Sequence, residues 1–401
     1  MKILWKNSIA LLLVLLTLSG CSFSPAVPAE APAAEIAVTP PPAPEPSPID
    51  VEPYLENMTL PEKVGQLFFV RPEALDPSQA AANAESGVGV TQMTPALGNM
   101  LVRYPVGGVV IFGKNITSPE QLKAFIADVQ RAAKTPLTFA VDEEGGTVTR
   151  LAIRPDFALP RFRSAAAVGR EGVGAAREMG ENIGAYLRQY GFTMDFAPVA
   201  DVATNPNNPV IGQRAFSGDA AEAAALSGAM AAGLRAAGIV PVYKHFPGHG
   251  DTAEDSHAGL AVNHKTLDEL RTCEWLPYAR NDLDGCAVMV GHIALPMVTG
   301  EMTPASLSET VVNGYLRGEL GFEGLVVTDS LAMWGVKEKY SGAEAALAAL
   351  RAGCDVLLIP EDLPGAYQAV LAAAENGEIP ESRIDESVRR ILLCKARAGL
   401  L

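Results

Sequence analysis

Short runs of apolar and β-branched residues recur along the chain, and a polar or glycine-rich break follows each of them. Eight of these runs have the length and composition of β-strands. They are residues 64–70, 107–112, 137–142, 192–202, 239–246, 287–295, 324–332 and 354–360. Most are almost continuously apolar, which is typical of parallel strands that are covered on both faces.

Alanine-rich stretches with helical character lie between these runs. They include residues 119–133, 174–190, 219–238 and 342–353. Alternating strands and helices predict a parallel sheet with helical crossovers. Eight such units predict an α/β fold of the (β/α)₈ TIM-barrel type in a single domain. A doubly wound open sheet is the alternative.

The N-terminal part of the chain differs in composition from the rest. A basic start precedes an apolar run at 9–18 that is too short to span a bilayer, and the small residues before Cys21 resemble a bacterial lipoprotein signal. We expect a signal peptide at 1–20, a lipidated Cys21 with a disordered Pro/Ala-rich linker at 21–50, and the (β/α)₈ domain at 51–401.

Charge and cysteine content narrow the possible partners. The chain has 31 Lys and Arg against 46 Asp and Glu, a net charge of −15, so we expect no nucleic-acid partner. The cysteines that follow Cys21 show no C-x-x-C spacing, so a thiolate zinc site is not expected. The sequence does not choose a disulfide pairing among Cys273, Cys286, Cys354 and Cys394.

Polar residues gather where the predicted strands end. They are Asp142, Asp201, Lys244, His245, His292 and Asp329. In a barrel these ends form one face, where reactive side chains meet. We therefore expect the functional site at this face. For any single residue, an ion pair that ties strand ends together is the alternative.

Three of the motifs near these ends contain groups suited to catalysis or sugar binding. Asp329 directly follows the apolar run GLVV and can act as a nucleophile, base or ligand, although an N-cap is also possible there. Asp142 and Arg150 in AVDEEGGTVTR form a pair that commonly grips vicinal hydroxyls. Arg214 lies in the loop NNPVIGQRAFSGD, where a surface arginine is the alternative.

Three of the chain's five histidines lie in the segment KHFPGHGDTAEDSH. Metal ligation by His245, His249, Asp251, Asp255 and His257 is one interpretation. Against it, a proline and a glycine separate the first two histidines, so they do not share a helix face. In the other interpretation, Asp255 accepts a hydrogen bond from His257 and fixes its tautomer, which makes the imidazole a proton shuttle.

These motifs together resemble glycoside hydrolase family 3, in its single-domain β-N-acetylglucosaminidase branch. The resemblance rests on KHFPGHG followed by DSH, on DEEGG with a later arginine, on GQRAFSGD and on VVTDSLAM, and it covers Leu60 to Leu401. Many members carry a second α/β domain, whereas only 72 residues follow Asp329 here, so we expect no second α/β sandwich domain.

The resemblance implies a role for each matching residue. Asp329 matches the catalytic nucleophile, His257 the acid/base, and Asp255 the residue that orients this histidine. The positions that match sugar-binding residues are Asp142, Arg150, Arg214, Lys244 and His245.

The sequence thus predicts a retaining exo-β-N-acetylglucosaminidase that needs no cofactor or metal. Its expected substrates are small carbohydrates, namely N-acetylglucosaminides such as peptidoglycan fragments. We expect a monomer outside the cytoplasm, anchored to the cell membrane through Cys21. A β-glucosidase or glycoside phosphorylase of the same family, a metal-dependent barrel hydrolase and a non-catalytic sugar-binding lipoprotein are the alternatives.

Overall fold

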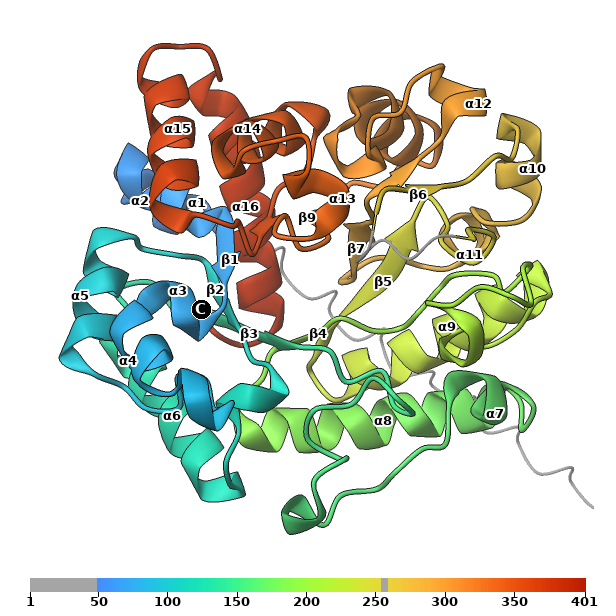
Figure 1. Ribbon diagram of the computed structural model, residues 1–401, viewed down its shortest axis with the longest axis horizontal. Coiled ribbons are helices and arrows are strands. Elements are labelled where there is room, and N and C mark those ends of the chain that lie inside the picture. The colour runs from blue at the N-terminus through green and yellow to red at the C-terminus, as the bar shows by residue number, and fades with distance from the viewer. Residues whose placement is uncertain (1–48, 254–258) are drawn as a thin grey trace, which may run out of the picture. The chain divides into compact units, whose positions relative to one another are not determined.

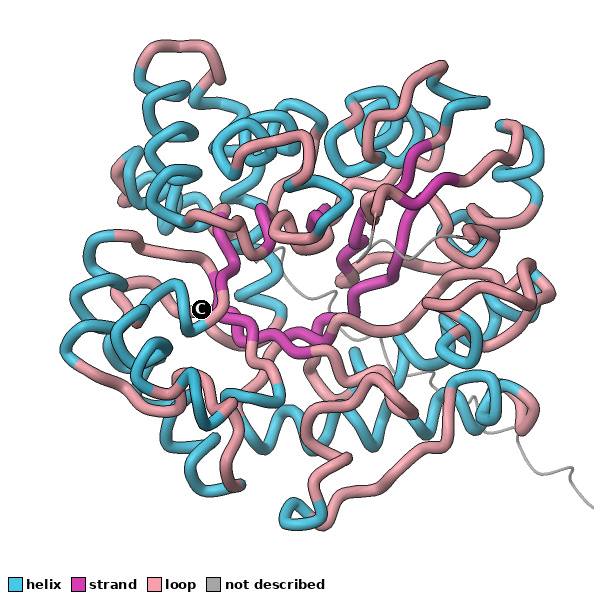
Figure 2. The backbone as a smooth tube through the Cα atoms, in the orientation of Figure 1, coloured by secondary structure: helices cyan, strands magenta, loops and turns pink. Residues whose placement is uncertain are grey.

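Eight parallel strands form a ring at the centre of the protein, and helices surround it (Figure 1). The computed structural model describes residues 49–253 and 259–401. The strands follow the order β10-β1-β2-β3-β4-β5-β7-β9, and a parallel bridge between Val327 and Val356 joins the two ends of this order. The predicted (β/α)₈ barrel is therefore confirmed, and Figure 2 shows its strands inside the helices.

The barrel strands are short, and all their residues are buried. They are β1 (Phe68–Val70), β2 (Gly108–Val110), β3 (Thr138–Val141), β4 (Met194–Asp195), β5 (Val240–Phe246), β7 (Ala287–Val290), β9 (Leu325–Thr328) and β10 (Leu357–Leu358). A separate two-stranded sheet pairs β6 (Ala261–Val262) with β8 (Ile293–Ala294).

Most of the helices lie in the connections between barrel strands. They are α1 (Glu52–Glu56), α2 (Leu60–Gln66), α3 (Pro72–Leu75), α4 (Pro77–Ala82), α5 (Pro95–Arg103), α6 (Pro119–Ala132), α7 (Ala165–Gly169), α8 (Val173–Tyr190), α9 (Ala220–Ala236), α10 (Leu267–Thr272), α11 (Leu276–Arg280), α12 (Pro296–Thr299), α13 (Trp334–Lys337), α14 (Gly342–Ala352), α15 (Leu363–Glu375) and α16 (Glu381–Arg397). A π-helix spans Thr310–Glu319.

Local sequence signals fix the ends of several helices. A capping box of Ser341 and Glu344 starts α14, and Gly353 ends it in the left-handed conformation, at φ 112°. Thr59 and Glu62 form the same box before α2. Because α2 continues through Gln66, the strand predicted at 64–70 is wrong for its first residues, and β1 begins only at Phe68.

The other predicted strands are also longer than the observed ones, and the difference is largest in the runs at 192–202 and 287–295. β4 ends at Asp195, and pairing with β5 resumes only as an isolated bridge between Val199 and Lys244, beyond Pro198, which has no N–H for a sheet ladder. The run at 287–295 divides into β7 and β8 around Gly291 and His292. The polar strand ends nevertheless come together as expected. Among the described helices, none is long and apolar enough to cross a membrane.

Lys395 is a fully buried cation on α16, at 1% exposure. Its Nζ donates a hydrogen bond to Gln66 Oε1 at 2.5 Å, and no carboxylate of the described residues lies within ion-pair distance. Burial lowers the pKa of Lys395 from its ordinary value of 10.5 to about 7. Folding therefore works against the charged form of this side chain.

We expect Lys395 to make the free energy of unfolding pH-dependent in the neutral to alkaline range. Between pH 7 and 10 the unfolded state holds the proton that the folded state has lost, so the free energy of unfolding rises with pH, by up to about 1.4 kcal/mol per pH unit from this group. Lys395→Met should remove this component and stabilise the protein most near pH 7. Urea unfolding of both proteins across this range measures the difference; parallel pH profiles would contradict it.

Candidate active site

The carboxyl-terminal ends of the strands surround a pocket of about 630 Å³. Asp142 directly follows β3, Lys244 and His245 lie near the end of β5, and Asp329 directly follows β9. The charged and histidine side chains that line it are Arg71, Asp142, Glu144, Arg150, Arg214, Lys244, His245, His249, Asp329, Lys337 and Glu361. Residues from distant parts of the chain thus meet at one face of the barrel.

Lys244 is the centre of an ion-pair cluster in this pocket. Its Nζ lies 2.8 Å from Asp142 Oδ1 and 2.6 Å from Glu144 Oε1, and its side chain is 3% exposed. Arg214 holds the same Glu144 through two hydrogen bonds, of 2.8 Å from Nε and 2.7 Å from Nη2. This bidentate contact and the lysine neutralise a buried carboxylate on both sides.

The cluster keeps its members ionised at neutral pH. Burial opposes the charge on Glu144, but attraction to Lys244 and Arg214 outweighs it and lowers the pKa of Glu144 to about 2. Burial likewise opposes the charges on Asp142 and Lys244, and their mutual attraction lowers the pKa of Asp142 and raises that of Lys244. Asp142 is therefore a charged acceptor beside charged donors, an arrangement that suits sugar hydroxyls.

Arg150 extends this cluster toward an aromatic side chain. Its Nη2 lies 3.5 Å from Asp142 Oδ2, and its guanidinium carbon lies 5.8 Å from the ring centroid of Phe112. The buried Nε of Arg150 has no hydrogen-bond partner among the described residues. A buried donor without a partner is unfavourable, so a substrate hydroxyl that accepts from it would be stabilised.

Glu143 positions the loop that carries Arg150. The backbone N–H groups of Arg150 and Leu151 donate to its Oε2, at 2.6 and 3.0 Å. Its Oε1 accepts from the N–H of Ala152 at 3.0 Å and from the Tyr186 hydroxyl at 2.9 Å. This fully buried carboxylate thus holds three consecutive backbone amides in place.

Glu143→Ala should lower kcat/KM about tenfold, because the loop would lose all four bonds and Arg150 would lose its fixed position. Tyr186→Phe is the matched control, since it removes one of the four bonds and should change kcat/KM less than threefold. Steady-state kinetics on one substrate compares the two. Similar losses in both variants would show that Glu143 does not act through the loop.

Asp329 is held at the pocket by the backbone on both sides of it. Its N–H donates to the carbonyl of Val290 at 2.9 Å, and its Oδ1 accepts from the N–H of Ser330 at 2.7 Å. His292 Nε2 donates to the carbonyl of Ser330 at 2.9 Å, and its Nδ1 lies 2.7 Å from the hydroxyl of Ser306. The carboxylate is therefore attached to the barrel wall through β7 as well as β9.

The surroundings of Asp329 favour its ionised form. Burial opposes the charge, but attraction to His292 and His245 and the hydrogen bond from Ser330 hold the pKa of Asp329 below its usual range. An ionised carboxylate that faces a cavity can act as a nucleophile at neutral pH. The interpretation of Asp329 as only a helix cap is not needed, because α13 starts at Trp334 and Met333 is its N-cap.

His245 and the following loop are fixed by one buried carboxylate, Asp201. Its Oδ2 accepts from His245 Nδ1 at 2.7 Å, and its Oδ1 accepts from the backbone N–H of His249 at 2.6 Å. Two glycines allow this close packing. A Cβ on Gly250 would lie 1.8 Å from the carbonyl oxygen of Val202, and Gly248 has φ +124°.

The structure brings six of the eight predicted catalytic and sugar-binding residues to one pocket. They are Asp142, Arg150, Arg214, Lys244, His245 and Asp329. Asp255 and His257 lie outside the described residues, as does Cys21, and their roles stay predictions. Glu144, Arg71 and Trp334 also line the pocket, although they were not among the predicted site residues. The repeated acidic pair in AVDEEGG could have indicated Glu144, whereas Trp334 looked like an ordinary apolar residue.

Three of the residues considered as metal ligands are described, and each has a protein partner. His245 Nδ1 is bonded to Asp201, and His249 Nδ1 lies 2.7 Å from the hydroxyl of Thr252. Asp251 Oδ1 accepts from Thr204 and lies 3.5 Å from Lys265 Nζ. Within 49–253 and 259–401, no three His, Cys, Asp or Glu side chains are arranged to hold a metal ion.

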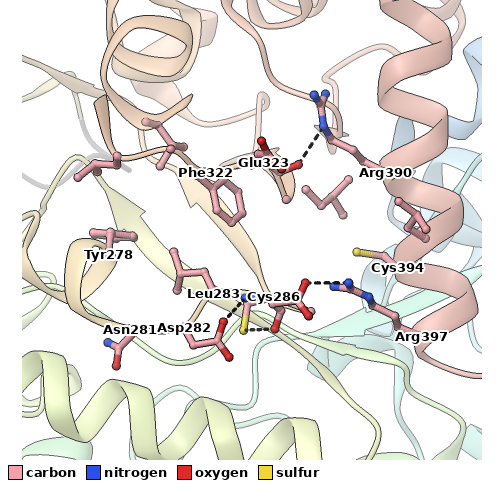
Figure 3. Close-up of a pocket in the computed structure, with 18 of the residues that line it drawn as sticks. Tyr278, Asn281, Asp282, Leu283, Cys286, Phe322, Glu323, Arg390, Cys394 and Arg397 are labelled. Carbon is pink, nitrogen blue, oxygen red and sulfur yellow. Dashed lines mark hydrogen bonds and ion pairs between the residues drawn. The ribbon is translucent and has the colours of Figure 1, made fainter. Parts of the chain in front are cut away.

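A second cavity, of about 500 Å³, lies at the opposite ends of the strands (Figure 3). Segments that precede β7 and β9 line it together with α16. Its two arginines have partners: Arg397 pairs with Asp284 at 2.7 Å, and Arg390 donates to the carbonyl of Glu323 at 3.1 Å. Because barrel enzymes react at the carboxyl ends of their strands, we place the active site in the first pocket.

The fold and the first pocket define a class of protein. The fold is a parallel (β/α)₈ barrel, and its pocket contains an ionised carboxylate beside charged side chains that can bind hydroxyls. This combination is typical of barrel hydrolases that act on carbohydrates. The chain belongs to glycosyl hydrolase family 3, because residues 59–394 match the family's N-terminal domain. It is a glycoside hydrolase, as its curated relatives are.

Two relatives and one solved structure illustrate the similarity. Beta-hexosaminidase LpqI of Mycobacterium tuberculosis is 37% identical over 306 residues, which are 74% of this chain and 77% of that protein. The beta-hexosaminidase of Pseudomonas aeruginosa is 37% identical over 305 residues, 74% of this chain and 88% of the relative. A family 3 β-N-acetylglucosaminidase from Paenibacillus sp. str. FPU-7 has a TM-score of 0.76 and 37% identity, and the match covers 86% of this chain but only 63% of that one.

Proposed function

We propose that the protein is a retaining exo-β-N-acetylglucosaminidase. One observation carries the proposal: an ionised Asp329 lines the same pocket as the hydroxyl-binding cluster of Asp142, Lys244 and Arg150. Relatives named beta-hexosaminidase, at 37% identity, support the N-acetylhexosamine as the sugar. The cluster would bind the terminal sugar and place its C1 beside the carboxylate.

The proposed reaction has two steps. Asp329 attacks C1 while His257 gives a proton to the departing glycosidic oxygen, which leaves a glycosyl ester on Asp329. Water then attacks C1, His257 takes its proton, and the ester bond breaks with net retention. Asp255 would keep the imidazole in one tautomer. Asp142 and Arg150 would bind hydroxyls more tightly as the sugar approaches the transition state.

We further propose that the natural substrates are cell-wall fragments. Arg71 lines the pocket, and no hydrogen bond or ion pair joins its guanidinium to another described residue. A muramyl residue beyond the scissile bond carries a carboxylate, which such a cation would bind.

The proposed location is the outer face of the cell membrane, with the lipid on Cys21. Its support is the sequence alone, from the apolar run at 9–18 to the small residues before the cysteine. Membrane fractionation of cells that produce the wild type or Cys21→Ala tests it. The proposal fails if the variant remains in the membrane fraction as fully as the wild type.

The full-length protein in detergent, given aryl β-N-acetylglucosaminide and aryl β-glucoside, tests the activity. We expect a higher kcat/KM on the N-acetylated sugar, with the β-anomer released first in a proton NMR time course. Added phosphate should not divert the product to a sugar phosphate. Preference for the glucoside, release of the α-anomer or formation of the sugar phosphate would each contradict the proposal.

A further inference from the structure

Trp334 is an exposed aromatic side chain at the active-site pocket. Its side chain is 45% exposed, and it is one of eight large hydrophobic side chains in residues 49–253 and 259–401 that are exposed to solvent. Of these, Trp334 alone lines the pocket that contains Asp329. An indole left in water at a sugar-binding pocket offers a large apolar surface to whatever enters.

The backbone around Trp334 is fixed relative to Asp329. The N–H groups of Leu331 and Ala332 donate to β10 and the residue after it, at 2.9 and 3.1 Å. Gly335, the next residue of α13, packs so closely that an added Cβ would lie 3.2 Å from the carbonyl oxygen of Gly259 and 3.6 Å from His292 Cβ. The start of α13 therefore cannot move far from the strand ends without loss of these contacts.

A cation helps to hold the indole ring itself. Lys337 Nζ lies 5.5 Å from the ring centroid, a distance at which the ammonium is attracted to the face of the ring. The same Nζ lies 3.9 Å from Glu361 Oε1, and both charged residues line the pocket. The ring is thus restrained by a contact that needs no substrate, and a restrained ring loses little entropy on binding.

The chemistry of Trp334 differs from that of the hydroxyl-binding cluster. Asp142, Lys244 and Arg150 offer charged hydrogen bonds, which suit a terminal sugar held from all sides. The face of the indole ring carries partial negative charge, so it suits the C–H groups on one face of a pyranose ring. The two kinds of surface therefore fit two successive rings of one substrate.

We propose that Trp334 is the platform for the sugar beyond the scissile bond, so that the enzyme prefers glycosides whose leaving group is itself a pyranose. This inference rests on the proposed glycosidase activity and names the class of leaving group. Trp334 is a specificity-determining residue in this proposal. It takes no part in bond breaking, which belongs to Asp329 and His257.

Two substrates that differ only beyond C1 test the platform. N,N′-diacetylchitobiose has a pyranose leaving group, whereas N-acetyl-β-glucosaminyl fluoride has no second ring. Trp334→Ala should lower kcat/KM on the disaccharide about tenfold and change that on the fluoride less than twofold. Trp334→Phe should recover much of the loss, because it restores an aromatic face.

Met297→Ala is the matched control, since Met297 is 63% exposed but does not line the pocket. It should leave both substrates unaffected. An equal loss on both substrates in Trp334→Ala, or no loss on the disaccharide, would overturn the platform. If the wild type cleaved neither substrate, the proposed function would fail instead, so the two failures are distinguishable.

Discussion

Asp329→Asn should reduce kcat by about four orders of magnitude or more on every glycoside, because the amide cannot form the glycosyl ester on which the proposed reaction depends. The change is almost isosteric. The carbonyl oxygen of the asparagine can still accept the 2.7 Å hydrogen bond from Ser330. We therefore expect a folded variant, with a melting temperature close to that of the wild type.

A binding measurement distinguishes loss of the nucleophile from loss of the pocket's structure. Asp142 and Lys244 are unchanged in Asp329→Asn, so calorimetry should still detect binding of N-acetylglucosamine. A variant that keeps more than about one hundredth of the wild-type activity would rule out Asp329 as the nucleophile. A variant that neither binds nor turns over would show only that the pocket was lost.

His257→Ala should have the second largest effect, and its size should depend on the leaving group. Poor leaving groups such as a hydroxyl of a second sugar need a proton as they depart, so kcat/KM on these substrates should fall about 10²- to 10⁴-fold. Activated aryl oxygens depart with little protonation. The decrease in kcat/KM on aryl glycosides should therefore be much smaller. A Brønsted plot of rate against leaving-group pKa measures this difference.

Asp255→Asn is the matched variant for the acid/base pair. It keeps the imidazole and removes only the charged group predicted to orient it, so its activity should lie between those of the wild type and His257→Ala. Equal losses of His257→Ala on good and poor leaving groups would show that His257 does not protonate the leaving group.

The barrel could be predicted from the sequence because parallel strands that are buried on both faces leave a nearly continuous apolar signal. The strand boundaries could not. The run VGQLFFV is apolar except for Gln66, but its first three residues belong to α2, which starts at the capping box of Thr59 and Glu62 and ends at Gln66. The run at 192–202 contains Pro198, which interrupts the regular ladder after Asp195, although a parallel bridge between Val199 and Lys244 continues the pairing beyond it. Apolar character alone does not distinguish a strand from a buried helix end.

Part of the site was predictable because the chain direction of a barrel places all strand ends on one face. Asp142 and Lys244 are 102 residues apart in sequence but 2.8 Å apart at their charged atoms. Glu144 was missed because its sequence position does not show whether it turns outward or pairs with Lys244 and Arg214. Trp334 was missed because exposure is a property of packing, which the sequence pattern does not report.

The most direct test of the proposed mechanism is to trap the glycosyl-enzyme. The full-length protein is incubated with 5-fluoro-N-acetylglucosaminyl fluoride, digested and analysed by peptide mass spectrometry. The fluorine slows hydrolysis of the ester, so the sugar should be found on Asp329 and on no other carboxylate, with Asp329→Asn unlabelled. A label on Asp142, Glu144 or any other residue in the wild type would contradict the assignment of Asp329 as the nucleophile.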